Sequence, residues 1–260
     1  MKKLAIIGMG NMGTALATGF LGAGVLQGAD IAAFDVDAAK LQTTTKKLGI
    51  TAASSAADAV LSAEMTLMAC KPQHVAGAVA EIGAALSGRA LLSIALGWDK
   101  ARYAAILPAD TRVQFVMPNT PAMVGEGMFL FESDTSFTES ELQTAHAYMA
   151  ALGEVVTLPS DLMGIGGAVS GCGPAFVDLL LEAFADAGVY YGLPRAVAQK
   201  LITQTVLGSA ALQKETGTDP AVLKNAVCSP AGSTIRGVAA LEENGFRAAC
   251  IAAIRAIMEK

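Results

Sequence analysis

The residues that could do chemistry in this sequence begin with a glycine-rich turn near the N-terminus. The run GMGNMG at residues 8–13 follows a short apolar segment and opens an amphipathic helix. In such a unit the first glycine makes the turn, the second lets a pyrophosphate approach the backbone, and the third allows close helix packing. The motif alone is weak in a chain of 27 glycines, but its context favours a dinucleotide site at the helix start. The residues expected there are Gly8, Gly10, Asn11, Met12 and Gly13.

One carboxylate is placed to choose between the nicotinamide cofactors. Asp35 ends the second apolar run, about 20 residues after the glycine turn, where a dinucleotide fold contacts the adenosine ribose. A carboxylate accepts hydrogen bonds from the ribose hydroxyls and repels a 2′-phosphate, so charge alone favours NADH. Lys40 lies one helical turn further on, which leaves NADPH open. Asp35 could instead be only a helix N-cap or turn residue.

Two proline-containing loops follow later strands. These are CKP at residues 70–72 and MPNTP at residues 117–121. The carboxyl ends of parallel strands form the edge where open α/β sheets bind ligands. We therefore expect Lys71, Pro72 and Asn119 at the cofactor site, with the Asn119 amide offered to the nicotinamide side. Each loop could equally be an ordinary rigid turn.

A second turn, near the C-terminus, interrupts a region with helical patterning. Residues 229–234 contain Pro230 and Gly232, and an apolar helix begins at Ile235. A helix start with exposed amides suits a carboxylate as well as a phosphate, and Thr234 adds a hydroxyl beside it. A plain helix cap is the alternative for these residues.

Other polar residues are better explained without a reaction. Asp178, Glu182 and Asp186 share one helix face and could hold Mg²⁺, but a solvated stripe is favoured and no metal site is predicted. His74 and His146 fall in helical segments, where solvated or core positions are favoured over catalytic ones.

The elements that must position these groups change type along the chain. Residues 1–158 alternate short apolar runs with helical segments, which is typical of strands covered on both faces in a parallel sheet. Predicted strands are 4–7, 31–34, 66–70, 91–95, 112–117, 127–131 and 154–158, and predicted helices are 12–23, 38–48, 73–86 and 139–152. After residue 161 only helical patterning follows. The sequence predicts an N-terminal Rossmann-type doubly wound α/β sheet (1–158) and an all-helical C-terminal domain (159–260).

Composition excludes several classes of function. The net charge is −5 and no Lys/Arg cluster exceeds a pair, so nucleic acid is not an expected partner. The four cysteines lack metal or disulfide spacing and indicate free thiols in a reducing cytoplasm. Glycines interrupt the first apolar run and residues 162–181, so neither a signal peptide nor a membrane span is predicted. The 53% hydrophobic content suggests apolar surface between subunits.

Several of these motifs together resemble those of a known family, the pyrroline-5-carboxylate reductases. Residues 220–242, PAVLKNAVCSPAGSTIRGVAALE, are similar to its signature, with the Val-Cys-Ser-Pro-x-Gly-x-Thr core intact. GMGNMG, CKP, MPNTP and SGCGPAF at residues 170–176 resemble further landmarks in the same order, so the likeness covers nearly the whole chain. One departure is Ala231, where the family commonly has a second glycine; its methyl group is expected to restrict the turn only mildly.

The resemblance implies reduction of Δ1-pyrroline-5-carboxylate to L-proline by NADPH or NADH, the last step of proline biosynthesis. It implies a substrate site of Ser229, Gly232, Ser233 and Thr234, in which the last three amides hold the carboxylate and the Thr234 hydroxyl bonds the ring nitrogen as the catalytic residue. It also implies a homodimer of interlocked helical domains, often assembled further into a decamer, with sites shared between subunits. A protonated cyclic imine is already electrophilic at C5, so this reaction needs neither a metal nor a strong general base.

Two other functions are open on the sequence. A 3-hydroxyacid dehydrogenase of the related two-domain kind shares the glycine turn, but it uses a lysine on the first long helix of the second domain, and residues 161–199 contain none. A cofactor-binding sensor would bind NAD(P)H tightly without oxidising it when pyrroline-5-carboxylate is added.

Overall fold

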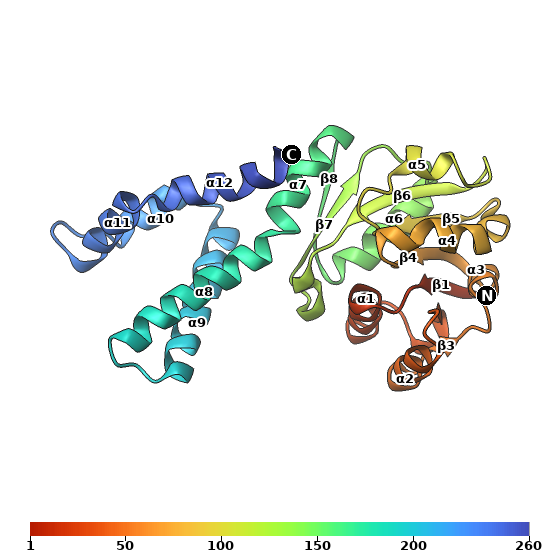
Figure 1. The fold of residues 1–260 in the computed structure, drawn as a ribbon, viewed down its shortest axis with the longest axis horizontal. Helices are drawn as coiled ribbons and strands as arrows, with labels where there is room; N and C mark the ends of the chain where they lie inside the picture. Colours follow the sequence, from red (N-terminus) through yellow and green to blue (C-terminus); the bar gives the residue numbers. More distant parts are fainter. Residues whose placement is uncertain (260) are drawn as a thin grey trace. The chain divides into compact units, whose positions relative to one another are not determined.

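The computed structural model describes residues 1–259, which form two compact units divided between Gly171 and Cys172 (Figure 1). The first unit contains an eight-stranded sheet. Its strands are β1 (Lys2–Ile7), β2 (Ile31–Phe34), β3 (Thr51–Ala52), β4 (Ala63–Met68), β5 (Ala90–Ser93), β6 (Arg112–Met117), β7 (Gly127–Glu132) and β8 (Gly153–Leu158). Its helices are α1 (Asn11–Gly22), α2 (Ala38–Leu48), α3 (Ala56–Ser62), α4 (Pro72–Ile82), α5 (Lys100–Ala104), α6 (Glu139–Ala150) and α7 (Met163–Ser170), with short 3₁₀ turns η1 (Gly28–Asp30), η2 (Gly83–Leu86), η3 (Thr120–Val124) and η4 (Ser160–Leu162).

The strand order is β3-β2-β1-β4-β5-β6-β7-β8, so the order reverses between β1 and β4. Neighbours from β3 to β6 pair in parallel, which confirms the predicted doubly wound sheet. The pairing of β6 with β7 is antiparallel, however, and the expectation of a wholly parallel sheet was wrong there. Only residues 118–126 connect these two strands, fewer than the dozen or so that a parallel crossover needs.

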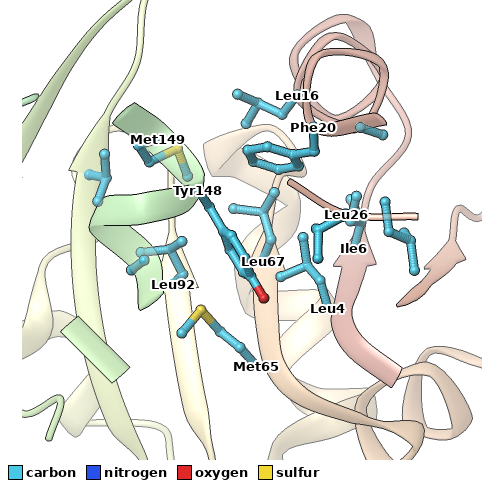
Figure 2. Packing of buried hydrophobic residues seen from close by; sticks show 14 of the residues in the cluster. Leu4, Ile6, Leu16, Phe20, Leu26, Met65, Leu67, Leu92, Tyr148 and Met149 are labelled. Carbon is cyan, nitrogen blue, oxygen red and sulfur yellow. The ribbon is translucent and has the colours of Figure 1, made fainter. Parts of the chain in front are cut away.

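Two apolar clusters cover the two faces of this sheet. One joins α1 and α6 to β1, β4 and β5, and Figure 2 shows Tyr148 of α6 beside Leu67 of β4, with Phe20 of α1 and Met65 of β4 nearby. The other packs α3, α4 and Tyr103 of α5 on the opposite face. Burial of such side chains contributes about 1.5–3 kcal/mol each, so the sheet edge that carries the loops rests on a well-packed core.

Helix α7 completes the first unit. It lies beside β7 (Figure 1), and Met163 at its start is buried against Phe115 and Leu130. The second unit consists of α8 (Gly173–Tyr190), α9 (Arg195–Thr216), α10 (Pro220–Ala226), α11 (Ser233–Glu243) and α12 (Phe246–Met258). This confirms the predicted helical C-terminal region, and α8 and α9 pack against each other as a helical hairpin.

Apolar side chains of the second unit are largely exposed in the single chain. Among its residues only Ala185 and Ala198 are buried apolar positions in the described chain. The stretch Ser160–Tyr190, with mean hydropathy 1.4 over its best window, could cross a membrane by length and composition. One such stretch is weak support for a span, because core helices of soluble proteins can be equally long and apolar.

A buried carboxyl group lies at the end of β7. Glu132 is 6% exposed, and its Oε2 atom has no hydrogen-bond partner. Burial raises the pKa of this carboxyl, the negative charges of Asp99 and Asp134 raise it further, and a hydrogen bond with Ser160 and the charge of Lys100 act in the opposite direction. The folded protein therefore holds this proton more tightly than the unfolded chain does.

We predict that Glu132→Gln stabilises the protein at neutral and alkaline pH. With a raised folded-state pKa, the stabilising contribution is fully present below the ordinary glutamate pKa of about 4.3 and is lost as pH rises through the folded value. The glutamine has no charge to bury, so its Tm should exceed the wild-type Tm by roughly 2 °C or more at pH 8 and by little near pH 4. Thermal melts across this range test it, with exposed Glu126→Gln as the control. A Tm difference that does not depend on pH would contradict the assignment.

Candidate functional site

The glycine turn lies at the carboxyl end of β1, at the point where the strand order reverses. Gly8 has φ +100°, and its amide donates to the Phe34 carbonyl at 2.8 Å. A Cβ on Gly13 would stand 2.1 Å from the Gly8 carbonyl oxygen. Both glycines are therefore required by the protein's own backbone, as the motif predicts for its first and third positions.

Gly10 differs, because nothing in the protein fills the space beside it. It is the N-cap residue of α1 with φ −69°, and a Cβ built there meets no heavy atom within 4 Å. The helix begins without a side-chain cap and without an acidic residue in its first turn. The first amides, of Asn11 and Met12, have no acceptor inside the helix. This open, positively polarised helix start fits a diphosphate.

Asp35 joins the glycine turn to the end of β2. Its Oδ2 accepts from the Met9 amide at 2.7 Å, and its Oδ1 accepts from the Asp37 amide at 3.0 Å. The N-cap of α2 is Asp37, whose side chain accepts from the Lys40 amide. Asp35 is therefore not the helix cap, although its bond to Asp37 gives it a turn-forming role as well. Its carboxylate lies at the same sheet edge as the glycine turn.

The loop after β4 closes the other side of this edge. Lys71 is exposed at the N-cap position of α4, and Pro72 occupies the first turn. The Trp98 indole donates to the Pro72 carbonyl at 2.9 Å, which holds the loop. Burial raises the pKa of the neighbouring Cys70 thiol to about 11. This thiol stays protonated at neutral pH and offers no nucleophile.

Asn119 follows β6 and has both ends of its amide occupied. Its Oδ1 accepts from the Met128 amide at 2.8 Å, and its Nδ2 donates to the Ser170 carbonyl at 3.0 Å. The expected amide contact with nicotinamide stays a prediction, and it would compete with these two bonds. The adjoining turn η3 packs against α1, so this loop borders the glycine turn's helix.

The predicted substrate residues lie together at the start of α11 in the second unit. Gly232 is its N-cap with φ −70° and ψ 172°, and the helix has no side-chain cap. The Gly232 amide donates to the Ser229 carbonyl at 3.0 Å, so it already closes a turn. The amides of Ser233 and Thr234 follow at the first two helical positions, and the Thr234 side chain is exposed in the single chain.

Ala231 adopts a left-handed backbone conformation, with φ 59°. It is the one non-glycine residue with positive φ among those described. This conformation costs an L-residue roughly 1–2 kcal/mol. The expectation that its methyl group restricts the turn only mildly was therefore wrong, because the turn requires the backbone region that alanine disfavours.

The structure thus places the expected residues in two sets, one in each unit. The nucleotide set borders the carboxyl ends of β1, β2, β4 and β6, and the substrate set begins α11. In the carboxylate ladder Asp186 pairs with Arg195, and no group of three or more potential metal ligands occurs within residues 1–259. His74 is exposed on α4, and His146 of α6 packs with its ring tilted against Phe131 of β7, so both lie in helices as the sequence predicts.

Two side-chain hydrogen bonds near this edge were not predicted from the sequence. The Ser93 hydroxyl at the end of β5 bonds the buried Tyr103 hydroxyl at 2.9 Å, and burial raises the pKa of that phenol. The first bond, from Ser93 to Tyr103, had a signal in the sequence, because a serine ends an otherwise apolar strand. No sequence signal existed for the second, the bond from Asn119, because its acceptor is a backbone carbonyl of Ser170.

Comparisons with known proteins agree over the whole chain. A family model described as pyrroline-5-carboxylate reductase dimerisation matches residues 160–260, and one described as NADP oxidoreductase, coenzyme F420-dependent, matches residues 3–97. The chain is similar to the pyrroline-5-carboxylate reductase of Treponema pallidum, with 38% identity over 98% of each chain. It is 37% identical to that of Escherichia coli over 100% of this chain and 97% of the relative. The crystal structure of the Plasmodium falciparum enzyme with NADP bound superposes with a TM-score of 0.90 at 30% identity, covering 99% of this chain and 96% of that one.

We predict that Gly10→Ala and Gly13→Ala separate binding from folding. Alanine at position 10 meets no protein atom, so Tm should stay within about 2 °C while the Kd for NADH rises at least about tenfold. Alanine at position 13 clashes with the Gly8 carbonyl and should cost about 3 kcal/mol or more of stability. Thermal melts and NADH fluorescence titrations measure both. Normal NADH affinity in a folded Gly10→Ala protein would rule out a diphosphate at this helix start.

Proposed function

The chain belongs to the pyrroline-5-carboxylate reductase family and reduces pyrroline-5-carboxylate to proline with NAD(P)H, and we propose which of its residues perform each part of that reaction. The observation that carries this assignment is that two helices begin in the same way, with a glycine N-cap and no side-chain cap. Gly10 before α1 and Gly232 before α11 are both extended N-cap glycines of helices without side-chain caps. One start lies in each unit, and each suits an anion. We assign the cofactor diphosphate to the first and the substrate carboxylate to the second.

The nucleotide is bound by residues 1–158. The amides of Asn11, Met12 and Gly13 face the diphosphate, with Gly8 and Gly10 giving the backbone its approach. Lys71 and Pro72 border the same edge, and the exposed Lys71 ammonium adds a positive charge near the phosphates. When bound, the reduced nicotinamide supplies the hydride.

Asp35 gives this chain a preference for NADH. Its carboxylate is held in place by two backbone amides, from Met9 and Asp37, and so it cannot swing away from a ligand without losing both bonds. A 2′-phosphate at the ribose would face this fixed negative charge. Lys40, the nearest following cation in sequence, is on the exposed surface of α2. The ribose hydroxyls of NADH, in contrast, donate hydrogen bonds to the Asp35 carboxylate.

The cyclic imine is bound by residues 159–260, at the start of α11. The amides of Ser233 and Thr234 hold its carboxylate, and the Gly232 amide, by donating to the Ser229 carbonyl, closes the turn that presents them. The Thr234 hydroxyl accepts the hydrogen bond of the ring nitrogen and thereby fixes which way the C=N bond faces. The short side chain has few rotamers, so little freedom is lost in this contact.

The chemical step needs orientation more than acid or base catalysis. Hydride adds to C5 of the protonated imine, the C=N π electrons move to the nitrogen, and neutral proline nitrogen then takes a proton from solvent. Thr234 stays neutral throughout, because its hydroxyl is too weak an acid to be the main proton source. The Cys70 thiol, with its pKa raised to about 11, takes no part.

The enzyme oligomerises through its C-terminal region, which matches the family's dimerisation model. We assign it the form of a cytoplasmic homodimer that can assemble further to a decamer, with no nucleic acid or membrane partner. Large apolar side chains more than half exposed on one protomer support burial by a second copy: Leu179, Leu201, Leu207, Leu212 and Ile251. All four cysteines are free, which fits a reducing compartment.

We predict that Thr234→Ala lowers kcat by roughly a hundredfold while the Kd for NADH changes less than about twofold. The variant loses the group that orients the ring nitrogen but keeps the amides of the helix start. Loss of reduced-nicotinamide absorbance on addition of pyrroline-5-carboxylate measures kcat, and Thr234→Ser, which keeps the hydroxyl, is the matched control. An unchanged kcat in the alanine variant would remove Thr234 from the reaction.

We predict that Asp35→Ser raises the ratio of kcat/KM for NADPH to that for NADH by about tenfold or more, because it removes one charge facing the 2′-phosphate. The loss of the Met9 bond should weaken both cofactors. Asp35→Asn keeps one acceptor oxygen and should change the ratio in the same direction with a smaller loss of affinity. A ratio that stays constant in both variants would mean that Asp35 serves only the turn.

A further inference from the structure

The side chain of Trp98 connects two loops at the nucleotide edge of the sheet. Trp98 lies in the loop after β5, and its side chain is buried. Its indole N–H donates to the carbonyl of Pro72, the first residue of α4, at 2.9 Å. The bond therefore joins the loop after β5 to a helix start 26 residues earlier in the chain, and both partners lie within the first unit.

The start of α4 directly follows the backbone that lies against the glycine turn. A Cβ on Gly8 would stand 2.7 Å from the Cys70 nitrogen, so these two segments leave no space between them. Lys71 and Pro72 come next, and Lys71 is the N-cap of α4, a helix without a side-chain cap. A movement of Pro72 would therefore displace the Lys71 ammonium, which is the positive charge assigned to the phosphates.

The indole of Trp98 is itself held in place by residues other than those of α4. The guanidinium carbon of Arg102 lies 4.1 Å from the centroid of the indole ring, and the Arg102 side chain also donates to the Gly97 carbonyl at 2.9 Å. The ring of Tyr103 lies 5.1 Å from that of Trp98, centroid to centroid. The Trp98 amide closes a turn onto the Ala95 carbonyl at 3.0 Å. The N–H group is thus a donor whose direction is fixed before α4 meets it.

We propose that Trp98 is a positioning residue for the cofactor: through its bond to Pro72 it holds Lys71 and the start of α4 in the form that receives the dinucleotide. This inference rests on the proposed function, in which residues 1–158 bind NAD(P)H. A ligand and the conformation that it favours stabilise each other by the same factor. Loss of the bond must therefore weaken NADH binding, and NADH must in turn make the start of α4 more rigid.

Trp98→Phe removes the donor and keeps an aromatic ring beside Arg102 and Tyr103. We expect hydrogen exchange of the backbone amides across residues 74–78, the first hydrogen-bonded turn of α4, to rise by about tenfold. The Kd for NADH should rise by about fivefold, the loss expected for one hydrogen bond. In the wild-type protein, saturating NADH should slow the same exchange by about fivefold or more. Mass spectrometry measures the exchange, and NADH fluorescence measures the Kd.

Thr111→Val is the matched control. The Thr111 hydroxyl donates to the Leu86 carbonyl at 3.1 Å, and this bond also joins a buried side chain to a backbone carbonyl, here in η2, which follows α4. Valine keeps the volume and loses the donor. The variant should lower Tm while exchange across residues 74–78 and the Kd for NADH stay at their wild-type values.

Three results would overturn the role of Trp98. Normal exchange across residues 74–78 in Trp98→Phe would mean that the bond does not hold α4, and faster exchange with an unchanged Kd would separate it from the cofactor. Equal changes in Thr111→Val would reduce the effect to general destabilisation. If Trp98→Phe does not fold, wild-type exchange that NADH leaves unchanged refutes the proposal. A wild-type protein that binds NADH without reducing pyrroline-5-carboxylate would instead refute the proposed reaction alone.

Discussion

The close passage of backbone against backbone at the end of β1 is the constraint on which the nucleotide half depends. A Cβ on Gly8 would lie 2.7 Å from the Cys70 nitrogen, and one on Gly13 would lie 2.1 Å from the Gly8 oxygen. The turn can form only with these glycines, and once formed it binds β2 through the Phe34 carbonyl and the Asp35 carboxylate. The helix start and the acidic group are therefore fixed relative to each other, as the proposed assignment of one nucleotide to both requires.

The sequence predicted those parts of the fold whose signals are local. The bounds of β2, β6 and α2 are as expected, because apolar runs bounded by polar residues are visible in single segments. The two-residue strand β3 and the short helices α3 and α5 were missed, since each is too short to repeat its periodic pattern often enough to be recognised. The antiparallel β6 and β7 pair was missed because its cause is a loop length, not a composition.

The candidate site shows the same difference between features with a local sequence signal and features set by the tertiary structure. Motif spacing could find the glycine turn, Asp35 and the α11 start, because their chemistry lies in consecutive residues. It could not find that Asn119 is tied to Ser170, 51 residues away, or that Ala231 has positive φ, since both depend on tertiary placement. Ala231 follows the pattern of strain stored beside functional groups: its cost is local, and the helix that it precedes presents the amides assigned to the substrate.

The proposed reaction relies on backbone amides and one neutral hydroxyl. These groups attract the substrate only weakly, so they cannot compensate for a poorly oriented C=N bond. The precision of the reaction must come from the packing that holds each set of groups within its own unit, and α7 is the last element of the sheet-bearing unit. A polar side chain from the loop after β6 meets the end of this element, where the Asn119 amide donates to the Ser170 carbonyl. Met163 and Met117 add apolar packing around the same helix. Apolar contacts alone would let the helix slide along its axis, whereas the directional bond from Asn119 at its end fixes its register within the first unit.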